Sequence, residues 1–483
     1  MKLKNYIQEL MQKYSEHIIC EGETLTSYGS VWEEAKKLAA VMESGKMYGA
    51  ACKSSINQMT VILACIYSES CFVALTEKYG SDFYNGIVNK LNLKNIVSDD
   101  GEKLQIHYIQ NDVANNMNNV EKDNTTNHKS VSSDKISEKN IRFILSTSGS
   151  SGTPKCVELS ERAVMSNLAD IPKIFIFERG DRVLIFNRLF HCAAIFGGMF
   201  AALTYGSDIY FYSGEFCPQS IISLINSNKI TVTSGTPTAF YYIADILKRK
   251  NNASTSLRLV FLAGESMTEN VKNRILNTLC NTQFIYFYGM TETCSGATFV
   301  YVENDMKCNC VGHAYPSLEL QIVDEHDNLC DNGVCGELKI SGDSLFSGYY
   351  NDEKQTEAVF RNGWLYTGDM AYMDNENRLY IVSRKDNMII RAGVNIYPEK
   401  IEQMLENDNN IVRAYVYLDR KDSSQPGLVF QIVTEHEEKI ESIRKRIIKM
   451  GLEKIGAGCM PDRIEIVDKI NTGVSGKKVN MNK

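Results

Sequence analysis

The sequence predicts an α/β protein with a large, multi-subdomain N-terminal body of parallel sheets plus a β-barrel-like part, and a small mobile α+β C-terminal domain. Strand-like and helix-like segments alternate up to Tyr288, which is the pattern of largely parallel sheets. Shorter strands follow Tyr288, and the final segment carries strands and helices of its own. We therefore expect a body at residues 1–383, a polar hinge at 384–387 and a lid domain at 388–483.

In the N-terminal part, apolar spacing and turn residues predict the elements in chain order. Ser30 and Glu33 form a capping-box pattern ahead of a helix that Gly45 ends. Residues from about 111 to 140 are rich in Asn, Lys, Asp and Ser, so we expect an exposed, mobile insertion there. The other expected elements are strands at 48–52, 72–76, 141–145, 182–186, 208–212, 230–234, 258–263 and 283–287, and helices at 56–67 and from 160 onward.

Beyond Tyr288 the expected strands are shorter. The turn-forming residues Asp374–Asn377 predict a hairpin before a strand at 378–382. Pro398 suits the first turn of a helix and begins the α+β pattern of the lid. The remaining expected elements are strands at 318–323, 336–340, 411–418, 427–434 and 463–467, and a helix at 441–450.

Composition excludes several classes of protein. A hydrophobic fraction of 43% with 23% charged residues is typical of a globular chain. The net charge of −7 argues against a general nucleic-acid binder. No apolar run is long enough to span a bilayer, and the segment from Met1 to Tyr14 lacks the hydrophobic core of a signal peptide. We therefore expect a cytoplasmic protein without a membrane span.

The 14 cysteines are scattered and lie mostly in apolar runs, so we expect reduced core thiols. One group leaves a zinc site open as an alternative. Its spacings lack the two-residue knuckle of such sites, and the intervening run 318–323 is expected to be a strand, which argues against a metal. The group comprises Cys308, Cys310, Cys330 and Cys335.

The run from Ser146 to Lys155, Ser-Thr-Ser-Gly-Ser-Ser-Gly-Thr-Pro-Lys, is the strongest candidate for a binding segment. It follows the expected strand 141–145 and precedes a helix that begins near Ser160. Glycine allows close backbone approach, so successive N–H groups can converge on an anion. The hydroxyls and the lysine add donors for a polyphosphate. A flexible surface loop is the alternative for such a run taken alone.

Four further motifs follow in the last two-thirds of the chain. They are Tyr288-Gly289-Met290-Thr291-Glu292, Leu365-Tyr366-Thr367-Gly368-Asp369, Ser383-Arg384-Lys385-Asp386 and Ser475-Gly476-Lys477. Together with the Ser/Gly run they resemble, in this order, the superfamily of acyl-adenylate-forming enzymes, most closely the AMP-forming acyl- and aryl-CoA synthetases. Only Cys156 departs from the family's phosphate loop, which ends in glycine.

The resemblance implies a nucleotide site. The phosphate loop from Thr147 to Lys155 would hold the β- and γ-phosphates of ATP, and Gly264–Ser266 would lie along the adenine with Tyr288 stacked on the base. Asp369 would accept the ribose hydroxyls, and Arg384 would reach the same sugar. The expected nucleotide-binding residues are Thr147, Ser148, Gly149, Ser150, Ser151, Gly152, Thr153, Lys155, Gly264, Glu265, Ser266, Tyr288, Gly289, Met290, Thr291, Asp369, Arg384 and Lys477.

The resemblance also implies the catalytic and metal-binding residues. Glu292 would hold the Mg²⁺ that ATP brings, with Thr147 as a second metal ligand. Lys477 resembles the lysine that bridges carboxylate and α-phosphate when the lid swings in. Taken alone, Asp369 is also compatible with a β-turn and Lys477 with a disordered tail. The expected catalytic residues are Lys477, Glu292, Thr291 and His191.

The run Leu189-Phe190-His191 resembles the Leu-Phe-His of acyl- and aryl-CoA synthetases, although Asn187-Arg188 replace the customary proline. Amino-acid-adenylating relatives place an aspartate in the following segment to pair with the substrate ammonium, and Cys192–Phe200 contains no acid. We therefore expect an aliphatic or aromatic acid without an α-amino group. The expected acyl-pocket residues are His191 (with a core histidine as the alternative), Ala193, Phe196, Thr236, Met290 and Ser295.

The run 388–398 resembles the CoA-ligase pattern Met-Ile-Ile-x-Gly-Gly-x-Asn-Ile-Tyr-Pro, from which Ala392 and Val394 depart. The resemblance therefore implies a two-step ligase that uses ATP and Mg²⁺, forms an acyl-AMP and transfers the acyl group to coenzyme A. An acyl carrier protein's phosphopantetheine thiol is the alternative acceptor, and a non-catalytic nucleotide- or acyl-binding relative is the second alternative. The expected residues of the thioester step are Arg391, Ala392 and Gly393, and the expected hinge residue is Asp386.

Overall fold

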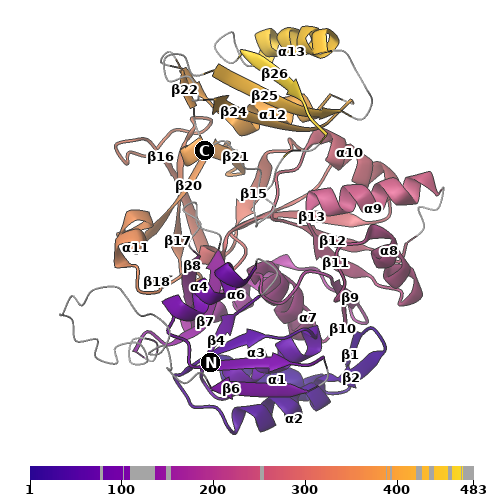
Figure 1. The fold of residues 1–483 in the computed structure, drawn as a ribbon, viewed down its shortest axis with the longest axis vertical. Helices are drawn as coiled ribbons and strands as arrows, with labels where there is room; N and C mark the ends of the chain where they lie inside the picture. The colour runs from indigo at the N-terminus through magenta and orange to yellow at the C-terminus, as the bar shows by residue number, and fades with distance from the viewer. Residues whose placement is uncertain are drawn as a thin grey trace, which may run out of the picture.

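The computed structural model describes residues 1–76, 80–101, 103–108, 136, 138–147, 154–250, 255–387, 389–391, 394–408, 410–419, 427–434, 440–454, 460–468 and 470. Two large sheets, a two-stranded hairpin and a three-stranded C-terminal sheet make up its strands (Figure 1). The expected insertion at about 111–140 lies largely outside the described residues. No helix in these ranges is long and apolar enough to cross a membrane.

The first sheet has 14 strands and a parallel centre. Strands β9 to β13 and β1 pair in parallel, whereas β14 and all strands on its far side pair antiparallel. The strands expected in a β-barrel-like part extend this same sheet. In sheet order its strands are β16 (Leu318–Val323), β17 (Gly336–Gly342), β20 (Trp364–Met373), β21 (Leu379–Arg384), β15 (Cys310–Ala314), β14 (Thr298–Tyr301), β13 (Gln283–Tyr288), β12 (Leu259–Leu262), β11 (Val232–Gly235), β9 (Arg182–Ile185), β10 (Asp208–Phe211), β1 (Ile18–Glu21) and β2 (Thr24–Ser27), with β19 (Phe360–Arg361) on β20.

The second sheet has seven strands and is parallel at its centre, where β7, β4, β3 and β5 run in the same direction. Strand β8 pairs antiparallel with β7 and carries the chain back after the Ser/Gly run. In sheet order the strands are β18 (Gly348–Tyr349), β8 (Lys155–Ser160), β7 (Ile141–Thr147), β4 (Cys71–Ala74), β3 (Met47–Ala51), β5 (Asn95–Asp99) and β6 (Leu104–Tyr108).

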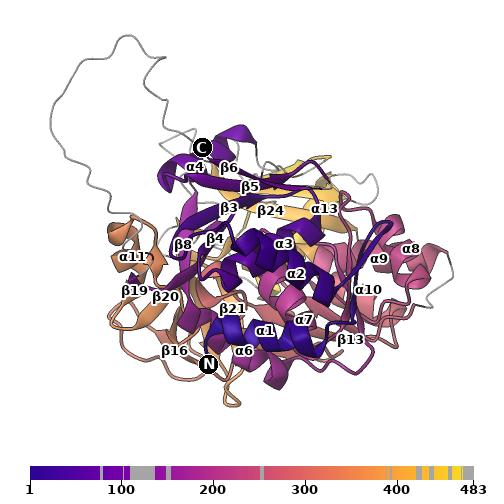
Figure 2. The ribbon, with the colours of Figure 1, turned by 90° about the horizontal axis from the view of Figure 1, so that it is seen from below.

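Helices α3, α6 and η1 pack between the two sheets and form part of the main core (Figure 2). Helix α3 is buried along nearly its whole length and contacts strands of both sheets. Helices α8 to α10 cover the outer side of the first sheet and lie on the right of Figure 1. The helices of the body are α1 (Leu3–Lys13), α2 (Tyr28–Ala39), α3 (Ser55–Tyr67), α4 (Ser81–Lys90), α6 (Glu161–Ile174), η1 (Ala193–Phe200), α7 (Ala201–Tyr205), α8 (Pro218–Ser227), α9 (Pro237–Arg249), α10 (Glu269–Thr278), η2 (Thr291–Thr293) and α11 (Glu353–Val359).

The C-terminal part has a hydrophobic cluster of its own, which includes Ile396, Leu405, Phe430 and Ile447. Pro398 occupies the first turn of α12, as the sequence predicts. Strand β25 pairs antiparallel with β24 and parallel with β26. The elements are η3 (Lys385–Asn387), β22 (Ile389–Arg391), β23 (Val394–Ile396), α12 (Pro398–Glu406), β24 (Ile411–Asp419), β25 (Gly427–Thr434), α13 (Ile440–Lys454) and β26 (Arg463–Ile466).

The predicted α/β class, with parallel sheets in the body and an α+β C-terminal part, is confirmed by this architecture. The predicted N-cap of α2 is wrong: the cap is Ser27, whose Oγ accepts a hydrogen bond from the Ser30 N–H. Pairing of β2 with β1 ends the strand at Ser27 and lets the helix begin three residues earlier than the capping-box pattern suggests. Strand β8, at Lys155–Ser160, is not anticipated by the sequence analysis.

A buried ion pair joins the N-terminus to the second sheet. Arg142 on β7 and Glu161 at the start of α6 are each 8% exposed, and Arg142 Nη2 lies 2.7 Å from Glu161 Oε2. The Leu3 N–H donates to the other carboxylate oxygen at 3.0 Å. Burial by itself would raise the pKa of Glu161, but the hydrogen bonds from Leu3 and Arg142 outweigh it and hold the pKa below its usual value.

We predict that Glu161→Gln lowers the stability of the body by about 3 kcal/mol, because it leaves the buried Arg142 without a full counter-charge. Since the folded-state pKa of Glu161 is lowered, its contribution is present above the unfolded pKa of about 4.3 and is lost as the pH falls through the folded value. Urea unfolding at several pH values measures both effects. The difference in the free energy of unfolding between wild type and variant should decrease as the pH is lowered. A difference that stays constant down to pH ~3 would contradict the assignment. Glu34→Gln, which breaks an exposed pair with Lys37, is the control.

Candidate active site

The parallel strands of the first sheet end along one edge, and several predicted site residues lie there. Gly235 ends β11, Gly264 follows β12, and Tyr288 ends β13. The register pairs Gly235 with Leu262 and Leu262 with Tyr286, so these ends are adjacent. Open α/β sheets bind ligands at the carboxyl ends of their strands. This edge is therefore the candidate active site.

A tight turn after β13 positions Glu292. The Ala297 N–H donates to the Tyr288 carbonyl at 2.8 Å, and η2 occupies the turn between them. Ser295 has a φ of +92°, a conformation that side-chain-bearing residues rarely adopt. A Cβ on Gly289 would lie 2.0 Å from the Ser295 carbonyl oxygen, so only glycine fits there. The turn is thus fixed by its own backbone, and Glu292 is half-buried on its outer side.

The ends of the phosphate loop flank this turn. Thr147 ends β7 and Lys155 begins β8, and the two residues pair across the hairpin. The predicted loop residues between them, Ser148 to Thr153, lie outside the described residues. Lys155 Nζ lies over the Tyr349 ring, 5.1 Å from its centroid, and the Tyr349 hydroxyl donates to Glu292 Oε1 at 2.7 Å. The structure therefore brings Lys155 and Glu292 to the same tyrosine.

Glu292 is suited to a hard cation. Lys155 and Glu292 form no ion pair, and no lysine or arginine in the described ranges pairs with this carboxylate. Mg²⁺ in proteins prefers carboxylate oxygens and keeps several waters and phosphate oxygens as its other ligands. A half-exposed carboxylate with one oxygen held by a hydroxyl fits that requirement. The Thr147 side chain is also half-buried at the end of its strand.

A second cluster joins Tyr288 to the antiparallel part of the sheet. The Tyr288 hydroxyl donates to Asp369 Oδ2 at 2.5 Å, and Arg384 Nη1 donates to Asp369 Oδ1 at 3.1 Å. The register between β20 and β21 pairs Asp369 directly with Arg384. Arg384 also donates to the Thr367 carbonyl at 2.9 Å. Three residues predicted for the nucleoside therefore lie in one hydrogen-bonded group.

Burial and a neighbouring carboxylate raise the pKa of both tyrosines. Burial raises the pKa of Tyr349 above its ordinary value, Glu292 raises it further, and the charge of Arg384 opposes the change. Burial and then Asp369 likewise raise the pKa of Tyr288. Both hydroxyls therefore stay protonated and act as donors.

The turn after β12 lies beside the start of α9. Gly264 is exposed with a φ of +87°, and Ser266 is also exposed. The Glu265 carboxylate lies near the first turn of α9, with Oε2 3.4 Å from the Thr238 N–H. The Tyr286 hydroxyl donates to the Glu265 carbonyl at 2.8 Å, which fixes the turn from the strand side. This arrangement leaves the backbone of Gly264 and Ser266 accessible along the edge.

The segment that carries His191 meets the Glu292 turn through its neighbour. The Thr291 hydroxyl contacts Cys192 Sγ at 3.6 Å, and burial raises the pKa of this thiol. His191 itself is exposed, with its ring 4.1 Å from the Phe190 ring centroid, so the alternative of a core histidine is wrong. Residues 193–200 form the π-helix η1, a rare form that is frequent at functional sites.

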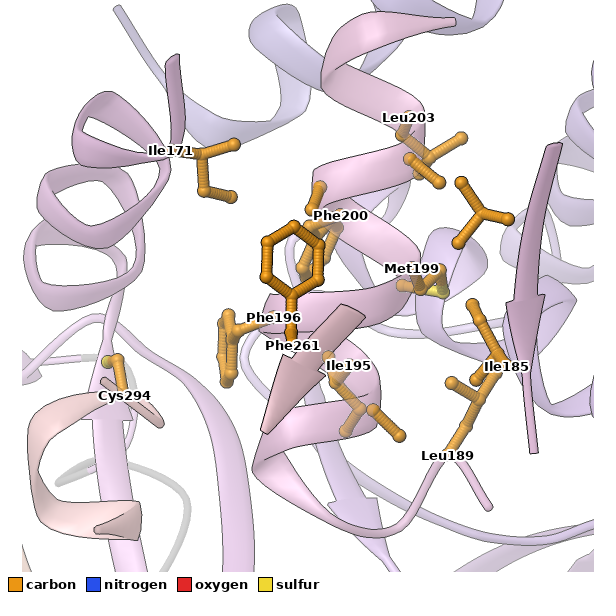
Figure 3. Packing of buried hydrophobic residues seen from close by; sticks show 14 of the residues in the cluster. Ile171, Ile185, Leu189, Ile195, Phe196, Met199, Phe200, Leu203, Phe261 and Cys294 are labelled. Atoms are coloured by element: carbon orange, nitrogen blue, oxygen red, sulfur yellow. The ribbon is translucent and has the colours of Figure 1, made fainter. Parts of the chain in front are cut away.

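The predicted acyl-pocket residues divide into two groups. Ala193, Met290 and Ser295 are half-buried near this contact. Phe196 is 1% exposed and packs against Phe143 at a centroid distance of 5.5 Å. In Figure 3 it lies on the side of η1 that faces α6, whereas Ile195 and Met199 face Ile185 and Leu189. Phe196 therefore belongs to the core, and Thr236 serves as the N-cap of α9.

The cysteine group is dispersed. Cys308 Sγ contacts Glu269 Oε1 at 3.1 Å, and Cys310 is buried on β15. Cys330 and Cys335 lie in the segment between β16 and β17. In the described part of the chain no three His, Cys, Asp or Glu side chains are placed to hold a metal ion together.

The C-terminal part approaches the body near α10. Asn407 Oδ1 accepts a hydrogen bond from the Glu269 N–H at 3.2 Å, and Lys385 Nζ lies 2.6 Å from Glu337 Oε2. The predicted hinge residue Asp386 is exposed within η3. Arg391 is described only as the end of β22, and Ala392, Gly393 and Lys477 lie outside the described residues.

The sequence analysis missed two residues of the site. Tyr349 comes from β18, 57 positions from Glu292, and no local pattern indicates their contact. The only signal is Gly348, whose φ of +135° marks a fixed backbone position just before the tyrosine. Cys192 directly follows His191, and its position in an apolar run suggested only a core thiol.

Comparisons with known proteins identify relatives of this chain. An acyl-CoA ligase of Aspergillus fumigatus is 34% identical over 275 residues, 55% of this chain and 46% of that protein. The 2-succinylbenzoate–CoA ligase of Bacillus subtilis is 31% identical over 277 residues, 56% of this chain and 55% of that protein. The alignment thus spans about half the length of these curated relatives.

Solved structures share the whole fold. The o-succinylbenzoate CoA synthetase of Bacillus subtilis, in complex with its acyl-adenylate intermediate, has a TM-score of 0.82 at 20% identity, covering 99% of this chain and 97% of that one. The same synthetase with ATP and magnesium has a TM-score of 0.80 at 20% identity and covers 98% of both chains. At such identity the likeness establishes the fold. The sequence profile of the AMP-binding enzymes matches residues 7–350, the greater part of the chain, and the protein therefore belongs to that family.

Proposed function

We propose that this protein is an ATP-dependent, AMP-forming ligase that activates a carboxylic acid without an amino group and transfers it to the thiol of coenzyme A. The observation that carries the proposal is the meeting of Lys155 and Glu292 at Tyr349, beside the group of Tyr288, Asp369 and Arg384. The named CoA ligases among the relatives support it.

The nucleotide would be held in three places. Thr147 and Lys155 bind the β- and γ-phosphates from the two ends of the phosphate loop. Asp369 and Arg384 bind the ribose, and Tyr288 lies against the base. Glu292 and Thr147 would hold the Mg²⁺ that accompanies ATP, and this cation would offset the negative charge of the phosphate oxygens. A synthetase of similar fold was solved with ATP and magnesium, which supports ATP and Mg²⁺ as the ligands.

The first step joins the acid to AMP. A carboxylate oxygen attacks the α-phosphorus, the bond from that phosphorus to the bridging oxygen breaks, and pyrophosphate leaves. The protein takes little part in the covalent chemistry of this step. Its contribution to the rate therefore comes mainly from positioning the reactants and from charge complementarity. Lys477 is assigned to the bridge between carboxylate and α-phosphate from its resemblance to the family's lysine.

The second step releases AMP. The thiol loses its proton to solvent, its sulfur attacks the acyl carbonyl, the carbon–oxygen bond to phosphate breaks, and a thioester forms. We assign the body to residues 1–383, the hinge to 384–387 and the lid to 388–483, with rotation at Asp386 between the steps. Arg391, Ala392 and Gly393 are assigned to the thiol channel from the run 388–398.

Two features bear on the acid. Cys192–Phe200 contains no carboxylate that could pair with a substrate ammonium. His191 is exposed next to the contact between Cys192 and Thr291, which suits a residue at the entrance of an acyl site. Aliphatic and aromatic acids are therefore the substrate class that we propose.

A panel of carboxylic acids tests the proposal directly. We expect pyrophosphate release that depends on ATP, Mg²⁺ and one group of non-amino acids, followed by thioester formation when coenzyme A is added. Replacing coenzyme A with a holo-carrier protein separates the two acceptors. Nucleotide binding without pyrophosphate release for any acid would identify a non-catalytic relative.

Gly289→Ala should disrupt adenylate formation. Its Cβ would meet the Ser295 carbonyl oxygen at 2.0 Å, so the turn must shift and carry Glu292 with it. A displacement of about 1 Å can cost about 10²-fold in rate, and we expect a loss of this size in pyrophosphate release. Gly427→Ala is the control, because its Cβ would lie 3.6 Å from the nearest atom, on Asp462. Full activity of Gly289→Ala would show that the turn tolerates the shift.

Lys477→Ala should separate the two half-reactions. We expect adenylate formation to fall by about 10²–10³-fold, because one charge-stabilising donor is lost. Thioester formation from supplied acyl-AMP should be unchanged, since the lysine has left the site in that step. Rapid-quench assays of each half-reaction measure this, and equal losses in both would contradict the assigned role.

A further inference from the structure

We propose that Tyr349 is a positioning residue that keeps Glu292 and Lys155 apart and oriented, so that the carboxylate is presented to Mg²⁺ and the ammonium to the phosphates. This inference rests on the proposed function. It adds a residue that belongs to none of the motifs from which the site was predicted.

The hydroxyl of Tyr349 orients the carboxylate. Its Oη lies 2.7 Å from Glu292 Oε1 and donates a hydrogen bond to that oxygen. A hydrogen bond from a hydroxyl to a carboxylate is of the strong, charge-assisted kind. It fixes the rotamer of a half-buried glutamate that would otherwise sample several.

The ring of Tyr349 holds the ammonium. Lys155 Nζ lies 5.1 Å from the ring centroid, within the range of a cation–π contact. Opposite charges that share one small site would normally pair, yet Lys155 and Glu292 form no ion pair. The aromatic ring satisfies the cation and the hydroxyl satisfies the anion. The two charges therefore remain available to a ligand that carries both a metal and phosphates.

Tyr349 is itself held rigidly. Its N–H donates to Thr356 Oγ1 at 2.9 Å, and β18 pairs it with Val157 of β8. The Phe346 ring packs against it at 5.1 Å, and the Phe346 N–H donates to the Glu292 carbonyl at 2.8 Å. Tyr349 is 7% exposed. Its position is thus set by the same segment that fixes the backbone of Glu292.

Binding of an α,β-methylene analogue of ATP, measured by calorimetry with Mg²⁺ and with EDTA, tests the proposal. Tyr349→Phe keeps the ring and removes the hydroxyl. We expect its affinity for the metal-free analogue to equal that of wild type. The increase in affinity on adding Mg²⁺ should be about tenfold smaller than in wild type. Tyr349→Leu also removes the ring, so Lys155 can pair with Glu292, and we expect weaker binding under both conditions.

Tyr380→Phe is the matched control, because its hydroxyl donates to Asp374 Oδ2 at 2.9 Å in a hairpin away from the site. It should keep the wild-type response to Mg²⁺. If Tyr349→Phe also keeps it, the tyrosine only fills space and the inference fails. If wild type binds no nucleotide at all, the proposed function fails first. Circular dichroism and the unfolding midpoint confirm that each variant is folded.

Discussion

The hydrogen bond from Tyr288 to Asp369 is the interaction on which the rest of the site depends. Tyr288 ends the last parallel strand, and Asp369 lies on β20, in the antiparallel half of the same sheet. This bond is 2.5 Å long and largely buried. It joins the carboxyl end of the parallel strands to the antiparallel strands that carry Asp369 and Arg384. Without it, Tyr288 and the pair of Asp369 and Arg384 would lie on strands with no direct link at this point.

The two clusters follow one physical scheme. Each carboxylate, Asp369 and Glu292, accepts a hydrogen bond from a tyrosine hydroxyl. Each also has a cation close by, Arg384 in a direct pair and Lys155 across an aromatic ring. A phenol satisfies one lone pair of a buried carboxylate without neutralising its charge. Both carboxylates are thus oriented by a tyrosine and remain charged.

The sequence predicted those parts of the fold that local patterns control. Strands 318–323 and 427–434 have the bounds expected from their apolar runs and flanking turns, and Ser160 caps the helix that follows the phosphate loop. The cap of α2 was misplaced because strand pairing decides between Ser27 and Ser30. The contact of Tyr349 with Glu292 joins residues 57 positions apart, and only the tertiary fold brings them together. The same holds for Cys192, whose apolar neighbours mask its contact with Thr291.

The π-helical turn of η1 has a consequence for how the segment around His191 can change. Its eight residues, Ala193–Phe200, run directly into the α-helix α7, which is anchored between the sheets. Each residue of an α-helix advances the side chains by about 100°. Deleting one residue of η1 would rotate its first turn, next to His191 and Cys192, by about that angle relative to α7. A change of one residue in length could therefore re-aim these two side chains.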